Sequence, residues 1–364
     1  MADALLAVAH GTSPYLTVYE RSGTTFTKLA DPATLPPNIA TGASWDPTNT
    51  YLAVSHVASP FITIYERSGS TLTKLANPAT LPASTGRGVS WDATGTYLAV
   101  AHTSSPYVTV YERSGTTLTK ITDPAALPTN TGYGVSWDST GTYLAVAHDT
   151  TPFLTVYERS GSTLTKLSDP AALPTGNARG VSWDSTGTYL AVAHSSSPYL
   201  TVYERSGSTL TKLANPATLP AGTGLDVAWD STGTYLAVGH VTAPFVTVYE
   251  RSGTTLTKIT NPATLPPNTA TGVSWDSTST YLAVAHFTSP FLTVYERSGT
   301  TFTKLADPAT LPPSTGNGVS FAAVGTIKFW DGAEFVTAPI RVYDGTSFQP
   351  ALLKRWDGAQ WTNA

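Results

Sequence analysis

The sequence predicts an all-β fold in which small antiparallel sheets repeat around a closed ring. Three observations predict it: a unit of 46 residues recurs without insertion, every unit alternates β-branched or aromatic residues with small ones, and the first and last units are incomplete in complementary ways. A period in the forties is typical of ring-forming β repeats and of helical solenoids. Alternation with period two favours strands, and the prolines in every unit would break helices long enough to pair.

Two residue types mark the repeat. Histidine recurs every 46 residues, at His10, His56, His102, His148, His194, His240 and His286. Tryptophan keeps the same step at Trp45, Trp91, Trp137, Trp183, Trp229 and Trp275, and Phe321 takes the next slot. Both sets are predicted to be structural, and we expect each histidine to hydrogen-bond a neighbouring sheet because buried polar groups are normally paired.

One unit, residues 88–128, illustrates the four strands expected in each. The alternating runs place them at 88–92, 97–102, 107–113 and 117–121. On the second strand Leu98 and Val100 share one face and alanines fill the other, so copies of the sheet can pack on one another. The fourth strand carries a lysine, a common way to blunt an exposed edge.

The two chain ends complete each other. The repeat region begins with a second strand at 5–10 and finishes with a first strand at 318–321, so together they form one whole unit. An open stack would instead need atypical polar caps at both ends. Six whole units and one split unit therefore predict a seven-bladed β-propeller of four-stranded antiparallel blades over residues 1–322, followed by a tail at 323–364.

The first hairpin of each unit carries a family resemblance. The run Ser-Trp-Asp-Ser-Thr-Gly-Thr followed by Tyr-Leu-Ala-Val resembles the first hairpin of WD-repeat-like β-propellers, over roughly residues 3–321. This chain has Tyr-Glu where that family has Trp-Asp, and it lacks the family's Gly-His. The family's hydrogen-bonded tetrad therefore does not carry over.

The tail contains a different repeat of 13 residues. Trp330-Asp331-Gly332, Tyr343-Asp344-Gly345 and Trp356-Asp357-Gly358 are each followed by an aromatic residue, namely Phe335, Phe348 and Trp361. Asp-Gly between β-forming residues favours a tight hairpin. Three such hairpins are too small to bury a core, so we expect them to attach the protein to others or to oligomerise it. The pattern resembles tail segments of tailed-phage virion proteins.

Composition excludes several classes of protein. Charged residues make up 12% of the 364 residues and the net charge is −4, against a usual charged share of roughly 25%. We therefore expect no nucleic-acid partner. No apolar run is long enough to insert in a membrane, the N-terminus lacks the basic region of a signal peptide, and cysteine is absent.

The repeated polar residues are candidates for metal binding or catalysis. Seven histidines invite a metal site, and six aspartates at the ends of the first strands, such as Asp92, could ring a cation. Structural histidines and Asx-type turns explain both patterns better, so no metal and no cofactor is predicted. A catalytic site needs unlike groups at one place, whereas near-identical units supply like groups at seven places, which argues against an enzyme.

Variation among the units points to one rim. The connection from the fourth strand to the next first strand varies at Thr41, Arg87, Tyr133, Arg179, Leu225, Thr271 and Asn317, and a glycine beside it becomes Asp226 once. The residue after each histidine varies as well, with Asp149 and Phe287 among its forms. We predict a partner-binding face formed by Arg87, Tyr133, Arg179, Leu225, Asp226, Asn317, Asp149 and Phe287, because Arg and aromatic residues dominate contact energies; neutral drift in exposed loops is the alternative.

These observations lead to a functional prediction. We expect a non-enzymatic structural or binding component of a phage virion, made in the host cytoplasm, whose partners are other virion proteins or host-surface molecules. A multivalent glycan-binding lectin is the alternative, and a propeller hydrolase or oxidoreductase is the third.

Overall fold

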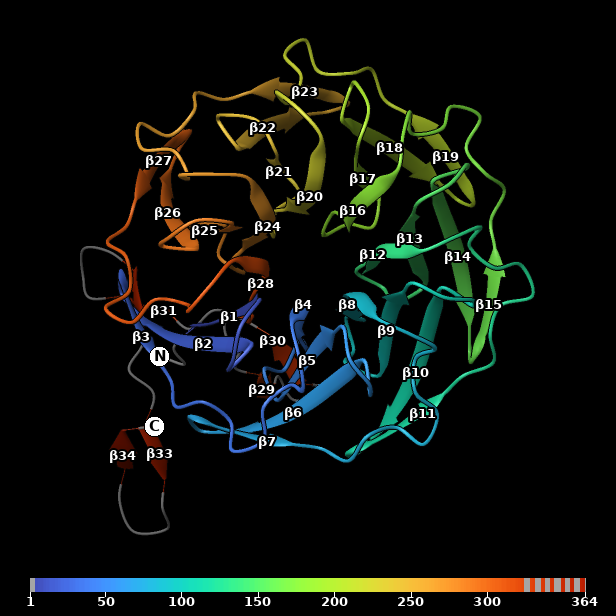
Figure 1. Ribbon diagram of the computed structural model, residues 1–364. Coiled ribbons are helices and arrows are strands. Elements are labelled where there is room, and N and C mark those ends of the chain that lie inside the picture. The colour runs from blue at the N-terminus through green and yellow to red at the C-terminus, as the bar shows by residue number, and fades with distance from the viewer. Residues whose placement is uncertain are drawn as a thin grey trace. The chain divides into compact units, whose positions relative to one another are not determined.

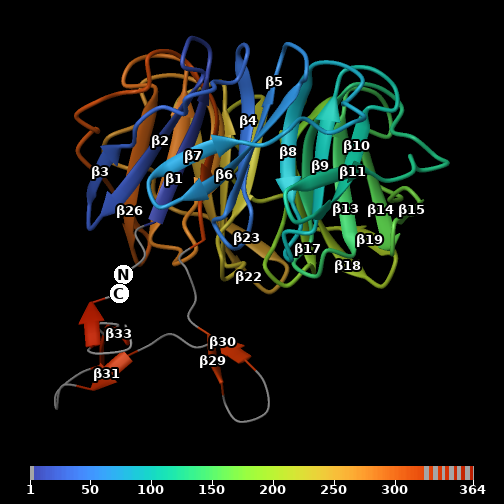
Figure 2. The ribbon, with the colours of Figure 1, turned by 90° about the horizontal axis from the view of Figure 1, so that it is seen from below.

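The computed structural model describes residues 4–323 and six short strands between 328 and 363. Residues 4–323 form a ring of seven four-stranded antiparallel sheets, as predicted (Figure 1). Seen from the side, the sheets stand next to one another with their strands running between two rims (Figure 2). Nowhere in the described part of the chain is there a helix long and apolar enough to cross a membrane.

Every blade has the same strand order from the centre outwards. The innermost strands are β4 (Ala40–Trp45), β8 (Gly86–Trp91), β12 (Gly132–Trp137), β16 (Ala178–Trp183), β20 (Gly224–Trp229), β24 (Ala270–Trp275) and β28 (Gly316–Phe321). The second strands are β1 (Ala4–His10), β5 (Tyr51–His56), β9 (Tyr97–His102), β13 (Tyr143–His148), β17 (Tyr189–His194), β21 (Tyr235–His240) and β25 (Tyr281–His286).

The outer half of each blade is a hairpin with a short edge. The third strands are β2 (Leu16–Ser22), β6 (Ile62–Ser68), β10 (Val108–Ser114), β14 (Leu154–Ser160), β18 (Leu200–Ser206), β22 (Val246–Ser252) and β26 (Leu292–Ser298). The edge strands are β3 (Thr25–Lys28), β7 (Thr71–Lys74), β11 (Thr117–Lys120), β15 (Thr163–Lys166), β19 (Thr209–Lys212), β23 (Thr255–Lys258) and β27 (Thr301–Lys304).

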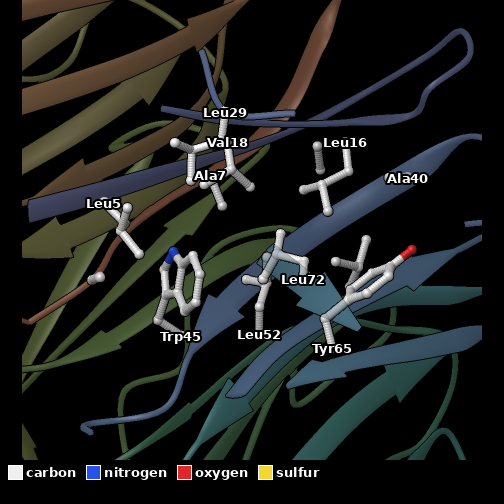
Figure 3. Packing of buried hydrophobic residues seen from close by; sticks show 13 residues of the cluster. Leu5, Ala7, Leu16, Val18, Leu29, Ala40, Trp45, Leu52, Tyr65 and Leu72 are labelled. Carbon is white, nitrogen blue, oxygen red and sulfur yellow. The ribbon is translucent and has the colours of Figure 1, made fainter. Parts of the chain in front are cut away.

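The second strand of each blade packs on both neighbouring blades. Leu98 and Val100 of β9 lie in a cluster with residues of β5 and β6, while Ala99 and Ala101 lie in a cluster with residues of β12 and β13. Alternate side chains on a strand point to opposite faces, so one strand supplies a bulky face and a small face. Figure 3 shows the equivalent interface between the closing blade and the first full blade, with Leu5 and Ala7 facing Trp45.

The ring closes by pairing the two ends of the repeat region. β28 pairs antiparallel with β1, with Phe321 opposite Leu6 and Val319 opposite Val8, and the closing sheet has the order β28-β1-β2-β3. The predicted split blade is confirmed. Buried apolar clusters join all seven neighbouring pairs of blades.

The histidines are buried inside their own blades. His102 is fully buried and its Nε2 is hydrogen-bonded to Thr109 Oγ1 at 2.9 Å, seven residues along the chain. The six other histidines repeat this contact. We predicted that each histidine bonds a neighbouring blade, which is wrong for Nε2. Its partner is the threonine hydroxyl on the third strand of the same blade. Burial lowers the pKa of His102 to about 4.

The aspartates close the turn after each inner strand. Asp92 Oδ1 accepts hydrogen bonds from the N–H groups of Thr96 and Tyr97, both at 2.8 Å, and Oδ2 accepts one from Thr94 Oγ1 at 2.6 Å. The carboxylate satisfies the backbone of a tight turn, as Asx-type residues do. The Asx-turn interpretation of these aspartates is confirmed.

Arginine links the blades by stacking on tyrosine. The guanidinium of Arg113 lies 4.4 Å from the ring centre of Tyr51 in the preceding blade, and its Nε donates to Gly95 O at 2.7 Å. No glutamate in residues 5–323 takes part in an ion pair, so Glu–Arg pairs do not join the blades there. Glu112 instead accepts a hydrogen bond from Tyr97 of its own blade.

The C-terminal segment contains three two-stranded antiparallel sheets, as its aromatic-Asp-Gly pattern predicts. They are β29 (Lys328–Trp330) with β30 (Phe335–Thr337), β31 (Arg341–Tyr343) with β32 (Phe348–Pro350), and β33 (Lys354–Trp356) with β34 (Trp361–Asn363). The register places Trp330 opposite Phe335, Tyr343 opposite Phe348 and Trp356 opposite Trp361. The Asp-Gly turns lie outside the described residues, and the role in attachment or oligomerisation stays a prediction.

Candidate functional site

The variable residue of each unit is a bulge in the innermost strand. In β12, Gly132 lies opposite His148 and Gly134 opposite Ala147, so Tyr133 between them has no partner in the ladder. The same shift occurs in the other six inner strands. The sequence placed this position in a connecting loop, which is wrong: it belongs to the strand. A bulge leaves its residue unpaired and redirects the side chain.

The seven bulges meet in one cavity of about 520 Å³ at the centre of the ring. All seven inner strands line it, and the seven bulge side chains are of five different kinds. The bulge residues around it are Thr41, Arg87, Tyr133, Arg179, Leu225, Thr271 and Asn317. Equivalent positions in the seven blades therefore bring chemically different side chains into one cavity.

Two arginines flank a tyrosine on one side of the cavity. The guanidinium of Arg179 lies 4.1 Å from the centre of the Tyr133 ring, and that of Arg87 lies 5.8 Å from it. A guanidinium over an aromatic face is attracted by the ring quadrupole. Within residues 5–323, neither arginine forms an ion pair. This side of the cavity carries two positive charges without a counter-charge.

Asp226 lines the same cavity from β20. It is half-buried, and its Oδ2 accepts a hydrogen bond from the N–H of Val273 in the next blade at 2.9 Å. Desolvation raises the pKa of Asp226 to about 7, against the lowering effect of the N–H groups of Val273 and Val227. A carboxyl near neutrality can both accept and return a proton.

Three polar bulge residues bind the neighbouring inner strand. Thr41 Oγ1 donates to Gly86 O at 2.7 Å, Asn317 Nδ2 donates to Ala40 O at 2.8 Å, and Thr271 Oγ1 donates to Gly316 O. These bonds fix the side chains across three seams between blades. The part of the wall that these three residues form is therefore polar and held in place.

Most of the predicted binding face lies in this cavity. Arg87, Tyr133, Arg179, Leu225, Asp226, Asn317 and Phe287 line it, and Phe287 is 47% exposed. Asp149 does not line it: its carboxylate accepts a hydrogen bond from Asn177 Nδ2 at 2.5 Å. The prediction omitted Thr41, Thr271 and Val57, although variation between units marks all three positions. It also omitted Ile39, whose position is threonine in five of the other units and Asn177 in the sixth.

Metal ligands do not cluster in the part of the chain that is described. There, no group of three or more His, Cys, Asp or Glu side chains is placed to hold a metal ion. The histidines point into the blades, and six aspartates are occupied by turns. Any chemistry at the cavity must therefore come from the residues that line it or from a bound ligand.

Solved structures with this fold include proteins named as lactonases. A periplasmic gluconolactonase of Pseudomonas aeruginosa has a TM-score of 0.69 at 18% identity, covering 88% of this chain and 99% of that one. A putative 6-phosphogluconolactonase from Bacteroides fragilis has a TM-score of 0.68 at 14% identity, covering 88% and 98%. The β-propeller domain of Cps50 (Swd1) from Myceliophteria thermophila follows at 0.56 and 12%, covering 75% and 88%. At these identities the likeness establishes the fold.

No family model and no curated protein sequence matches this chain. The resemblance to β-propellers is confirmed at the level of the fold, while the likeness to tailed-phage proteins is not shown.

The prediction of a non-enzymatic virion component, with a lectin as its alternative, is wrong. The solved structures that cover 88% of the chain include proteins named as lactonases, which are enzymes. The argument from symmetry failed for a physical reason. It placed the variable residues at seven separate loops, whereas the bulges bring them into one cavity where unlike groups can act together.

Proposed function

We propose that this protein is a hydrolase that opens a small anionic lactone in the central cavity. The observation that carries the proposal is the meeting of two unpaired arginines, a tyrosine and a carboxyl in a single cavity of about 520 Å³. Concave sites of this size with a few convergent polar groups are the usual place for small-molecule chemistry.

The arginines define the charge of the substrate. A guanidinium offers donors in a planar fork that matches carboxylate and phosphate oxygens. Arg87 and Arg179 both lie close to Tyr133, so both can reach one anionic group bound beside them in the cavity. We expect the substrate to carry a carboxylate or phosphate in addition to the lactone.

The remaining walls suit a polyhydroxylated molecule. Thr41, Thr271 and Asn317 line the cavity with hydroxyl and amide groups. Hydroxyls both donate and accept hydrogen bonds, and an amide does the same through separate atoms. The lactonase names of the similar structures support a sugar-derived lactone as the substrate.

Hydrolysis of such lactones by the purified protein tests the proposal. Glucono-1,5-lactone, its 6-phosphate and neutral γ-butyrolactone are compared by pH-stat titration against buffer alone. We expect turnover of the phosphorylated lactone, and a loss of about 10- to 100-fold in kcat/KM for each of Arg87→Gln and Arg179→Gln, because each removes a charge-assisted hydrogen bond.

Lys74→Gln is the matched control, since it makes the same charge change on an edge strand where Lys74 binds Asn77. It should leave kcat/KM unchanged. The proposal is overturned if the wild-type protein hydrolyses none of the three lactones faster than buffer.

A further inference from the structure

One blade carries a different residue at a position where the other six carry glycine. The residue after the bulge is glycine at Gly42, Gly88, Gly134, Gly180, Gly272 and Gly318, and aspartate at Asp226. The glycines bring the inner strands close together: a Cβ on Gly88 would lie 2.5 Å from Tyr133 O, and one on Gly134 would lie 2.7 Å from Arg179 O. Glycine is used where backbones approach this closely.

Asp226 keeps its place by bonding to the next blade. Oδ2 accepts the N–H of Val273 at 2.9 Å. Oδ1 lies beside Gly180 of the preceding blade, where a Cβ would fall 2.8 Å from it. One carboxylate oxygen is therefore fixed by the backbone, and the absence of a side chain on Gly180 leaves space beside the other.

The cavity contains a single carboxylate among the described residues. Apart from Asp226, its lining includes no carboxylate, histidine or cysteine. The seven histidines are fully buried in the blades, bonded to threonines. Asp226 also forms no ion pair within residues 5–323, so neither arginine neutralises it. Desolvation raises the pKa of Asp226 to about 7, which suits a general base at neutral pH.

We infer that Asp226 is the catalytic general base of the lactone hydrolysis proposed above, on which this inference rests. The carboxylate accepts a proton from a water molecule as the water oxygen forms a bond to the lactone carbonyl carbon. When the ring C–O bond of the tetrahedral intermediate breaks, Asp226 returns the proton to the leaving alkoxide. Lactone and water are consumed, a hydroxy acid is formed, and the carboxylate is restored.

Two substitutions at Asp226 distinguish a catalytic role from a structural one. Asp226→Asn keeps an oxygen that can accept the Val273 N–H but cannot take up a proton. Asp226→Gly introduces the residue that the other six blades carry, so the ring is expected to fold. Asp123→Asn makes the same change at a carboxylate that does not line the cavity and pairs with Lys120, and it is the matched control.

The experiment measures kcat/KM for the phosphorylated lactone from pH 5.5 to 8.5, with a thermal melt of each variant. We expect the wild-type rate to rise with pH and level off above about pH 7 as the base ionises. Asp226→Asn and Asp226→Gly should lose at least about 100-fold and lose this rise, and formate should restore part of the activity of Asp226→Gly alone. A merely structural aspartate would give neither the altered pH profile nor the rescue.

The outcomes distinguish this inference from the proposed function. If the wild type is active and both Asp226 variants keep their rate within threefold and their pH profile, Asp226 is not the base, and the proposed function stands. If the wild type hydrolyses no lactone, both are overturned.

Discussion

The two ends of each inner strand are under different packing constraints. At one end six tryptophans and Phe321 repeat almost without change, and each aspartate that follows Trp45 to Trp275 holds a turn. At the other end, four residues earlier, the seven bulge positions hold five kinds of side chain. The same strand therefore carries the framework at one end and the site at the other.

Packing explains the difference between the two ends. Trp137 is buried in a cluster with residues of the preceding blade, and its ring lies 6.3 Å from that of Tyr97. Tyr133, at the bulge of the same strand, is half-buried at the wall of the cavity. A tightly packed side chain cannot change size cheaply, whereas a bulge residue facing a cavity can. The blades therefore repeat the same backbone, while the side chains that line the cavity differ from blade to blade.

Lowering the pH should produce the largest loss of stability, because it acts on the histidines buried in the blades. Burial lowers the pKa of all seven histidines from 6.5 to about 4. Between these values the unfolded chain binds up to seven more protons than the folded one, so stability falls as the pH falls, by at most about 9 kcal/mol per pH unit. Urea unfolding at pH 7.5 and 5 should show a steep decrease in midpoint. Equal midpoints would contradict the burial of neutral histidines, and Arg87→Gln should behave as the wild type does.

Removal of the closing strand should give the next largest effect. A chain ending at Thr315 lacks β28, whose Val319 and Phe321 are buried against neighbouring blades. Losing the burial of these two side chains costs about 3–6 kcal/mol, and β1 is left as an open edge. Thermal melting should show a large decrease relative to a chain ending at Ala323, which keeps β28. The same melting temperature for both chains would rule out closure by this strand.

Aspartates at the two ends should differ in what they contribute to stability. Asp92→Ala leaves two backbone N–H groups of a buried turn without their acceptor, at a cost of about 2–4 kcal/mol. Asp149→Ala at the opposite rim removes one hydrogen bond to Asn177, at a cost of about 1 kcal/mol or less. Chemical denaturation of both variants measures this difference. Equal losses in the free energy of unfolding for the two variants would show that the two rims of the ring do not differ in the way that the packing indicates.

A substitution at the bulge should have the smallest effect. Leu225→Thr changes a half-buried residue of the cavity wall to one found at two other bulges. We expect the free energy of unfolding to change by less than about 0.5 kcal/mol. Leu236→Thr is the control, because Leu236 is fully buried in the same blade and its loss should cost about 2–4 kcal/mol. A large effect of Leu225→Thr would mean that the bulge is part of the framework.

The strands were predictable because their signal is local. The expected strand at 97–102 coincides with β9, and those at 107–113 and 117–121 differ from β10 and β11 by one residue at the ends. The inner strand was predicted to begin at Gly88 and begins at Gly86. Its first half is a glycine, a variable residue and another glycine, so it shows no alternation from which a strand can be recognised.

The residues of the site were predictable, but their meeting place was not. Comparison of the units singled out Arg87, Tyr133, Arg179 and Asp226, because a position that varies in an otherwise constant repeat is visible in the sequence. The bulge depends on pairing with the second strand, where one residue is skipped in the register. Nothing in the sequence of the inner strand alone shows that skip.

The sequence by itself determined the number of blades, their four strands and the closure of the ring, because period, alternation and complementary ends are properties of the chain order. The tertiary structure alone decided that seven variable side chains share one cavity. Ring closure brings residues 46 positions apart to the same centre, and the bulges point their side chains into it. The candidate site arises there because closure of the ring brings residues that are far apart in the chain close together in space.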